Sequence, residues 1–371
     1  MITTPSFIDL HTHTRYPDLN NFQYQEIENS AKFGGYSDLL AMANSEVAID
    51  NLDNLSTAKE IDDKLNLRIH RVASLSKSLN GEELVDFNKF VSVGIRIFSD
   101  DGKSLTNDDL AEQAFKTIAQ LESGIFQHCE LNCHSNPGDV APPNFNSELI
   151  EIYEEEELSI LERDLKLVKK YNTRYHAQHI STKKSVEIIS KAKKIGLPVT
   201  AEVSPHHLLL SNETIEFFDG TYKMYPPIRN ESDRIALVQG LKDGVIDVIA
   251  TDHAPHEKSS KDTSIQKATF GIVGVETLLA ISLELYHNKT LKLTELLAKL
   301  TCNPAKIINI PRGEIKKNAV ADLTVIDLNK EWLINKDKFH SKSHNTPFHG
   351  RKVKGCAVKT FIAGKLVYDK E

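Results

Sequence analysis

The most informative stretch of the sequence reads Phe7-Ile8-Asp9-Leu10-His11-Thr12-His13. Its apolar start indicates a buried β-strand, and positions i and i+2 of a strand point to the same side. His11 and His13 therefore present two imidazoles at the strand end, where both can bind one metal ion. The pair alone is a weak indication, because the 15 histidines among 371 residues give about 0.6 His-x-His pairs by chance.

Short apolar, β-branched runs recur along the chain and alternate with amphipathic segments, which is the pattern of βα units around a parallel sheet. Eight runs are predicted as strands: residues 7–10, 37–43, 67–73, 91–98, 124–128, 174–180, 197–203 and 245–250. The helices predicted between them include residues 106–121, 158–171 and 183–195. Eight such units close a TIM (β/α)8 barrel, and a doubly wound sheet is disfavoured because no glycine-rich phosphate turn follows any strand.

The pattern changes near the C-terminus. Residues 321–327 and 359–368 read as strands with no helix between them. We therefore expect residues 1–310 to form the metal-dependent barrel and residues 311–371 to form a small C-terminal β subdomain. The fold class is α/β.

Composition and charge exclude several classes of protein. Apolar residues make up 40% and charged residues 26% of the chain, as in ordinary globular proteins. The net charge of −7 is spread out, so nucleic acid is not an expected partner. No stretch approaches the ~18 consecutive apolar residues of a transmembrane helix, so a membrane is not expected either. Four scattered cysteines favour free thiols, and no signal-peptide pattern opens the chain, so we expect a cytoplasmic protein. The acidic run of residues 154–157 is predicted to lie in a solvated loop or a first helical turn, without functional weight.

Four further candidate ligands fall at or just after the ends of other predicted strands. They are Asp101, His128, His179 and Asp252. In a TIM barrel the carboxyl ends of the strands meet at the face that carries the active site. Four imidazoles and two carboxylates on one rim suit one or two Zn²⁺ ions.

Each of these residues also has a purely structural interpretation. A histidine at a strand end is more often a hydrogen-bonded polar residue than a ligand. Asp100-Asp101-Gly102 alone is typical of a turn, and Asp252 alone is typical of a helix N-cap. The joint pattern over five strands is much harder to explain as unrelated turns.

Together these segments resemble the dihydroorotase family, in the branch that uses an aspartate instead of a carboxylated lysine between its metals. The resemblance covers nearly the whole chain and rests on residues 9–15, 34–36, 41–44, 98–102, 128–130, 179–182, 200–208, 251–256, 270–274 and 345–348. The string Thr251-Asp252-His253-Ala254-Pro255-His256 is shared with hydantoinases and allantoinases.

The resemblance implies a role for each candidate residue. His11, His13, His128 and His179 bind zinc, Asp101 is the shared carboxylate with Asp100 as the alternative, and Asp252 both binds metal and carries the proton. On the substrate side, the resemblance implies that Arg15, Asn44 and His256 hold a carboxylate next to His13, while Phe270 and Gly271 contact the ring.

The implied reaction is the reversible hydrolysis of dihydroorotate to N-carbamoyl-L-aspartate in pyrimidine biosynthesis. The zinc ion lowers the pKa of bound water to about 7, and the resulting hydroxide attacks the ring amide carbon. Asp252 then transfers the proton to the departing nitrogen as general base and acid.

The chain departs from the family pattern in places. Members of the family open with strands that complete a small β-sandwich, whereas the first barrel strand here begins almost at the N-terminus. We therefore expect residues 311–371 to lack these partner strands, so that a partner subunit covers the open edge or the true start lies upstream. Tyr225 stands where the family commonly has a substrate-contacting asparagine.

Two alternatives remain at this stage. One is another cyclic-amide hydrolase, such as a hydantoinase or allantoinase, although no lysine occurs between Val91 and Asp101. The other is a non-catalytic relative that scaffolds aspartate transcarbamoylase, which the retained metal histidines disfavour. Self-association or binding of aspartate transcarbamoylase is the expected partnership besides the small-molecule substrate.

Overall fold

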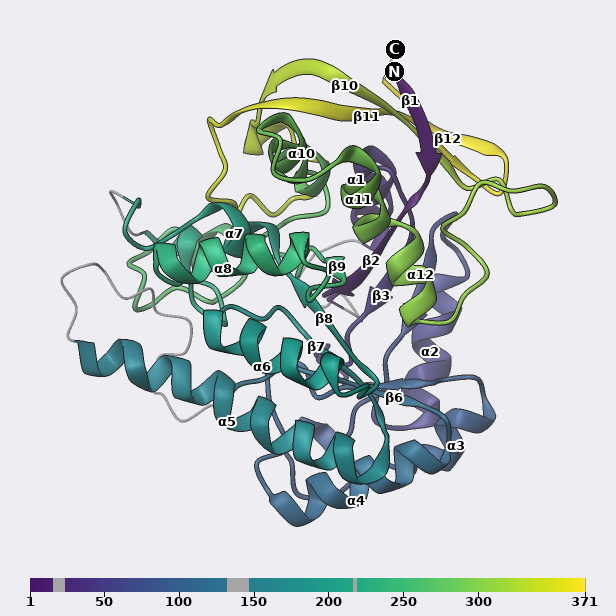
Figure 1. The fold of residues 1–371 in the computed structure, drawn as a ribbon. Helices are drawn as coiled ribbons and strands as arrows, with labels where there is room; N and C mark the ends of the chain where they lie inside the picture. The colour runs from purple at the N-terminus through teal and green to yellow at the C-terminus, as the bar shows by residue number, and fades with distance from the viewer. Residues whose placement is uncertain (16–23, 132–146, 216–218, 371) are drawn as a thin grey trace.

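The computed structural model describes residues 1–15, 24–131, 147–215 and 219–370 (Figure 1). Parallel barrel strands alternate with helices that pack around them. The barrel strands are β2 (Phe7–Thr12), β3 (Tyr36–Ala41), β4 (Arg68–Arg71), β5 (Ile97–Phe98), β6 (Gly124–Gln127), β7 (Arg174–Ala177), β8 (Val199–Val203) and β9 (Val248–Ile249). The α-helices are α1 (Tyr24–Gly34), α2 (Leu52–Asp62), α3 (Phe87–Ser92), α4 (Asp108–Gln120), α5 (Ser147–Tyr171), α6 (Lys183–Lys194), α7 (Pro205–Leu209), α8 (Glu231–Lys242), α9 (Lys258–Lys261), α10 (Leu278–His287), α11 (Leu293–Leu300) and α12 (Cys302–Ile307).

The barrel strands form two parallel sheets that meet at both seams. One sheet has the order β2-β3-β4 and the other has the order β5-β6-β7-β8-β9. Parallel bridges between Ala73 and Phe98 and between Thr12 and His253 join them. The strands thus follow one another around a ring, and the predicted TIM-type fold is confirmed. The fourth predicted strand is much shorter than residues 91–98, because α3 takes up residues 87–92.

Local sequence explains the barrel elements. Every residue of β2 is buried, as expected for a parallel strand covered on both faces. Helix α6 begins after Thr182, whose side chain accepts a hydrogen bond from the Ser185 backbone N–H and so caps the helix. Helix α4 begins in the same way after Asn107.

The C-terminal part forms an antiparallel sheet, with one strand that was not predicted. Its order is β1 (Ile2–Pro5), β10 (Leu323–Leu333), β11 (Lys352–Ile362) and β12 (Lys365–Asp369). Ile2 pairs with Ile326, and Pro5 pairs with Leu323. The small sheet therefore includes residues near the N-terminus, which the boundary at residue 310 had placed in the barrel. A four-residue strand ending in proline carries too little alternation to be recognised from its own sequence.

The prediction for the acidic run of residues 154–157 was wrong. These residues lie well inside α5, which begins at Ser147, and Glu156 and Glu157 are buried. A buried carboxylate needs hydrogen bonds or a cation, and Ser185 of α6 and Arg229 supply these to Glu157.

Strands β10 and β11 arch over α10 (Figure 1). Trp332 of β10 donates from its indole nitrogen to the carbonyl oxygen of Gly355 in β11, at 3.0 Å.

Across the described residues, no helix combines the length and apolar character needed to cross a membrane.

Candidate metal centre and active site

The predicted metal ligands all lie at the carboxyl ends of barrel strands. His11 and His13 lie at the end of β2, and Asp101, His128, His179 and Asp252 follow β5, β6, β7 and β9. The barrel thus gathers side chains from distant parts of the sequence at one face, and we call the edge formed by these six residues the rim.

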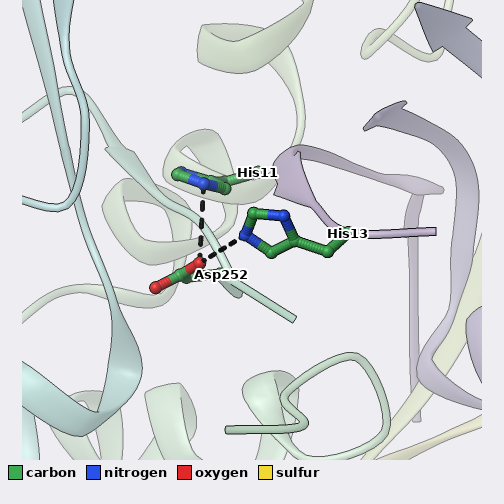
Figure 2. A group of neighbouring side chains, drawn as sticks. All are labelled: His11, His13 and Asp252. Atoms are coloured by element: carbon green, nitrogen blue, oxygen red, sulfur yellow. Dashed lines mark hydrogen bonds and ion pairs between the residues drawn. The ribbon is translucent and has the colours of Figure 1, made fainter. Parts of the chain in front are cut away.

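His11, His13 and Asp252 form one group whose ligand atoms lie within 4.8 Å of one another. The Oδ1 atom of Asp252 lies 3.2 Å from His13 Nε2 and 3.5 Å from His11 Nε2 (Figure 2). All three side chains are buried. They converge as ligands of a single cation would.

His11, Asp101 and His179 form a second group of the same kind. Asp101 Oδ1 lies 3.2 Å from His11 Nε2 and 3.7 Å from His179 Nε2. His128 lies beside this group but is not one of its three members, with its Nδ1 atom 3.0 Å from His179 Nε2 and 3.9 Å from Asp101 Oδ1. Because His11 belongs to both groups, the two candidate positions for a cation adjoin each other. The Nδ1 atom of His11 is hydrogen-bonded to Glu202, so its remaining nitrogen can bind only one ion.

Four buried atoms at this rim lack a hydrogen-bond partner among the described residues: His11 Nε2, Asp101 Oδ1, His128 Nε2 and Asp252 Oδ2. Buried polar atoms are nearly always hydrogen-bonded, so a cluster of exceptions needs an explanation. Imidazole nitrogen and carboxylate oxygen are ligands that suit zinc and similar divalent ions. The donor set therefore fits a metal ion.

The rim carboxylates and burial shift histidine pKa values in opposite directions. Burial alone lowers the pKa of His11, but Asp101, Asp252 and Glu202 outweigh it and raise that pKa well above its ordinary value. Burial and the nearby His179 lower the pKa of His128. His128 is therefore neutral, which is the form that binds metal, while His11 lies among negative charges that a cation would neutralise.

Three residues at the rim have positive φ angles: Arg15 at 54°, His179 at 27° and Asp252 at 49°. Residues other than glycine pay about 1–3 kcal/mol for such backbone conformations, which cluster at functional sites. The backbone of the next residue, Ile180, is held by a 3.0 Å hydrogen bond to the carbonyl oxygen of Glu202. This contact helps to hold the backbone of the segment that contains His179.

Asp100 and Asp101 have different environments. Asp100 Oδ1 accepts hydrogen bonds from the backbone N–H groups of Leu75 and Ser76, at 2.7 and 3.1 Å. Its Oδ2 accepts a short hydrogen bond from the Ser76 hydroxyl. Asp100 therefore anchors a neighbouring loop, and the structure favours Asp101 as the metal-facing member of the pair.

Glu202 in β8 is a residue for which no role was predicted. Its Oε1 accepts a hydrogen bond from His11 Nδ1 at 2.6 Å, and its Oε2 lies 3.1 Å from His176 Nε2. When a carboxylate bonds to one ring nitrogen of a metal-binding histidine, it orients the ring so that the other nitrogen faces the metal. The one signal for this role in the sequence was an acidic residue inside a predicted, largely apolar barrel strand.

The rim opens into a cavity of about 540 Å³. Its lining includes the predicted substrate-side residues His13, Arg15, Asn44, His256, Phe270 and Gly271. Arg15 Nε donates to the carbonyl oxygen of Pro255 at 2.9 Å, and its Nη2 lies 3.0 Å from His256 Nε2. Burial, reinforced by Arg15, lowers the pKa of His256 to about 2, so a neutral imidazole lies against the guanidinium.

Asn44 contacts one member of each of the two groups of candidate ligands, which we call the metal groups. Its Oδ1 lies 2.9 Å from His13 Nδ1, and its Nδ2 donates to Asp101 Oδ2 at 3.0 Å. The amide therefore orients a residue of each group, in addition to lining the cavity. This bridging position was not predicted.

The C-terminal part of the chain completes one wall of the cavity. Asn345 Nδ2 donates to the carbonyl oxygens of Ala254 and Gly271, at 2.8 and 2.9 Å. Asn345 Oδ1 accepts from the backbone N–H of His256 at 3.4 Å. Gly271 has φ 140°, and a Cβ there would lie 2.7 Å from His256 Nε2, so this wall requires glycine.

Tyr225 is buried and lines the same cavity. Its ring centroid lies 4.8 Å from that of His128 and 5.7 Å from that of Phe270. The ring therefore forms an apolar wall between the metal rim and Phe270.

Comparisons with known proteins agree with this geometry. Residues 2–367 match the amidohydrolase family. A dihydroorotase from Ehrlichia chaffeensis is 42% identical, in an alignment covering 100% of this chain and 83% of the relative. A dihydroorotase from Bacillus subtilis is 38% identical, covering 100% of this chain and 87% of the relative. Among solved structures, an L-hydantoinase from Arthrobacter aurescens superposes with a TM-score of 0.86 at 24% identity, covering 100% of this chain and 86% of that chain, which shows the fold alone.

Proposed function

This chain belongs to the amidohydrolase family and, within it, to the dihydroorotases, and from that premise we propose how its rim residues interconvert dihydroorotate and N-carbamoyl-L-aspartate. Dihydroorotases are cyclic-amide hydrolases of pyrimidine biosynthesis. The observation that supports the proposed chemistry best is the set of four buried ligand atoms that accept or donate no hydrogen bond among the described residues of the rim, next to a cavity lined by Arg15.

The proposed ion is zinc. His11, His13 and Asp252 would hold one ion, and His128 and His179 would hold a second, with Asp101 as the carboxylate that both ions share. When bound, zinc lowers the pKa of coordinated water to about 7 and polarises a carbonyl oxygen.

Asp252 is the proposed proton carrier. It lines the cavity, and its Oδ2 has no hydrogen-bond partner among the described residues. In hydrolysis this oxygen accepts the proton of the attacking water and delivers it to the ring nitrogen as the amide bond breaks. In ring closure the same carboxylate takes the proton from the carbamoyl nitrogen.

Arg15 is the proposed anchor for the substrate carboxylate, with His256, Asn44 and His13 around it. A guanidinium can bind a carboxylate through two parallel hydrogen bonds, and the partly buried site strengthens them. Phe270 and Gly271 would contact the ring from the opposite wall.

The test measures the zinc content of the purified protein and its hydrolysis of dihydroorotate, hydantoin and allantoin. We expect bound zinc, turnover of dihydroorotate, and loss of activity on chelation that zinc restores. Zinc without turnover of dihydroorotate would overturn the substrate assignment, and turnover that survives complete removal of metal would overturn the metal assignment.

A cytoplasmic location remains part of the proposal and fits the free thiols of Cys129, Cys302 and Cys356. Cys133 lies outside the described residues. Self-association and binding of aspartate transcarbamoylase stay predictions, which sedimentation of the chain alone and in a mixture would test.

A further inference from the structure

Glu157, on α5, is not one of the candidate metal ligands, but it contacts the segment that follows His179. Its carboxylate accepts hydrogen bonds from the backbone N–H groups of Ser181 and Thr182, at 3.1 and 3.3 Å. It also accepts from the hydroxyls of Ser181, Thr182 and Ser185. Burial alone raises the pKa of Glu157, but Arg229 and these donors hold it below its ordinary value, so the carboxylate is ionised.

Arg229 completes a buried pair with Glu157. Its Nε donates to the Ser181 hydroxyl oxygen at 2.9 Å, and its Nη2 lies 3.5 Å from Glu157 Oε2 and 3.4 Å from Glu130 Oε1. Glu130 lies two residues after His128 in the sequence. The pair is therefore connected to the segments that follow both β6 and β7.

We propose that Glu157 and Arg229 are positioning residues that hold His179, and with it the second metal group, in its binding geometry. This inference rests on the proposed function. His179 has φ 27°, a conformation that persists only when neighbouring contacts enforce it. On its N-terminal side the His179 backbone N–H points to Glu202 Oε1 at 3.4 Å. On its C-terminal side the Ser181 and Thr182 N–H groups are held by Glu157.

The two metal groups share His11 and Asn44, but their other members have different supports. Asp252 of the first group follows Thr251, whose backbone N–H donates to Asp9 at 2.8 Å, and His13 is held by Asn44. None of the contacts described for Glu157 reaches these residues. Loss of the Glu157 carboxylate should therefore weaken the second group and spare the first.

The test compares wild type with Glu157→Gln and with Glu155→Gln, a control from the same acidic run whose side chain is exposed. Chelator competition measures the affinity for each zinc ion, and steady-state kinetics separates kcat from KM for dihydroorotate. For Glu157→Gln we expect one ion to bind about 10–100-fold more weakly and kcat to fall, as for other residues that orient ligands. KM should stay near wild type, because the Arg15 side is unchanged.

Ser181→Ala is a milder variant that removes only the hydroxyl shared by Glu157 and Arg229. It should show the same selective loss of zinc affinity, and it keeps the test possible if Glu157→Gln does not fold. A lower melting temperature with unchanged zinc affinities and kcat in both variants would overturn the inference and leave Glu157 a purely structural residue. Wild type that binds no zinc or does not turn over dihydroorotate would instead overturn the proposed function.

Discussion

The two carboxylate oxygens of Asp252 have different surroundings. Oδ1 lies between His11 and His13, whereas Oδ2 has no hydrogen-bond partner among the described residues. One side chain thus offers an atom for a metal and another for a proton. The backbone of Asp252 has a positive φ of 49°, which residues other than glycine rarely adopt.

Replacement of Asp252 by asparagine separates these two roles. Asparagine has nearly the same shape and keeps an oxygen for the metal, but it cannot act as a base near neutral pH. We expect Asp252→Asn to keep its fold and most of its zinc, while kcat falls about 10²–10⁴-fold. Zinc analysis, melting temperature and kcat on one preparation check this, and a fully active variant would exclude Asp252 as the proton carrier.

Many site residues can be predicted from the sequence because their signals are local. His11 and His13 share a strand face, and Asp101 stands at a strand end. The roles of Glu202 and Asn44 could not be predicted in this way. Glu202 contacts His11 across 191 positions, and Asn44 contacts Asp101 across 57, and such contacts leave no periodic pattern in one sequence.

At the scale of the elements, β11 packs closely against α10 where the two cross. Gly355 has φ 105°, and a Cβ at that position would lie 2.3 Å from Leu283 Cδ1. Gly350, just before β11, has φ 82°, but a Cβ there would meet nothing within 4 Å. The two glycines share the backbone requirement and differ in the space around them.

Alanine substitutions at these glycines should therefore differ in cost. Gly350→Ala pays for the positive φ alone, about 1–2 kcal/mol. Gly355→Ala adds a steric clash with Leu283, about 1–3 kcal/mol more. Denaturant unfolding of both variants checks the difference. Equal losses of stability would show that Leu283 moves aside without cost.

The elements that were predicted correctly carry strong patterns, and the failures share a physical cause. Strand β1 is recognisable only from its partner β10, because four residues show no clear period. The acidic run was expected in solvent because charge usually avoids the interior. Its burial becomes intelligible only with the donors of α6 and with Arg229 in place, which the order of residues does not reveal.

At the scale of the whole molecule, an ion network with buried carboxylates and partly exposed cations joins the barrel to the segment that leads into the C-terminal sheet. Asp38 of β3 contacts Arg68, His70 and Arg312, with distances of 3.0, 2.8 and 3.3 Å. Arg68 and Arg312 also contact Asp322, just before β10. Burial alone raises the pKa of Asp38, but His70 and Arg68 outweigh it and hold it below its ordinary value of 3.8.

This network predicts a loss of stability in acid. Because the pKa of Asp38 is lower in the folded than in the unfolded protein, its contribution is present above about pH 4 and disappears as the pH falls further. Asp38→Asn removes this contribution, so its unfolding free energy should fall less steeply below pH 4 than that of wild type. Glu60→Gln, at an exposed position of α2, should behave as wild type. Denaturant unfolding at several pH values checks this, and identical slopes for all three proteins would contradict it.

The hydrogen bonds of Asn345 have a further consequence. They attach a residue from the C-terminal part of the chain to the loop segments that form one wall of the cavity. We therefore expect occupancy of the cavity to be thermodynamically linked to the packing of the C-terminal part, in which case each stabilises the other by the same free energy. With substrate bound, backbone amides near Asn345 should exchange their hydrogens more slowly, although most of the proposed substrate contacts come from the barrel.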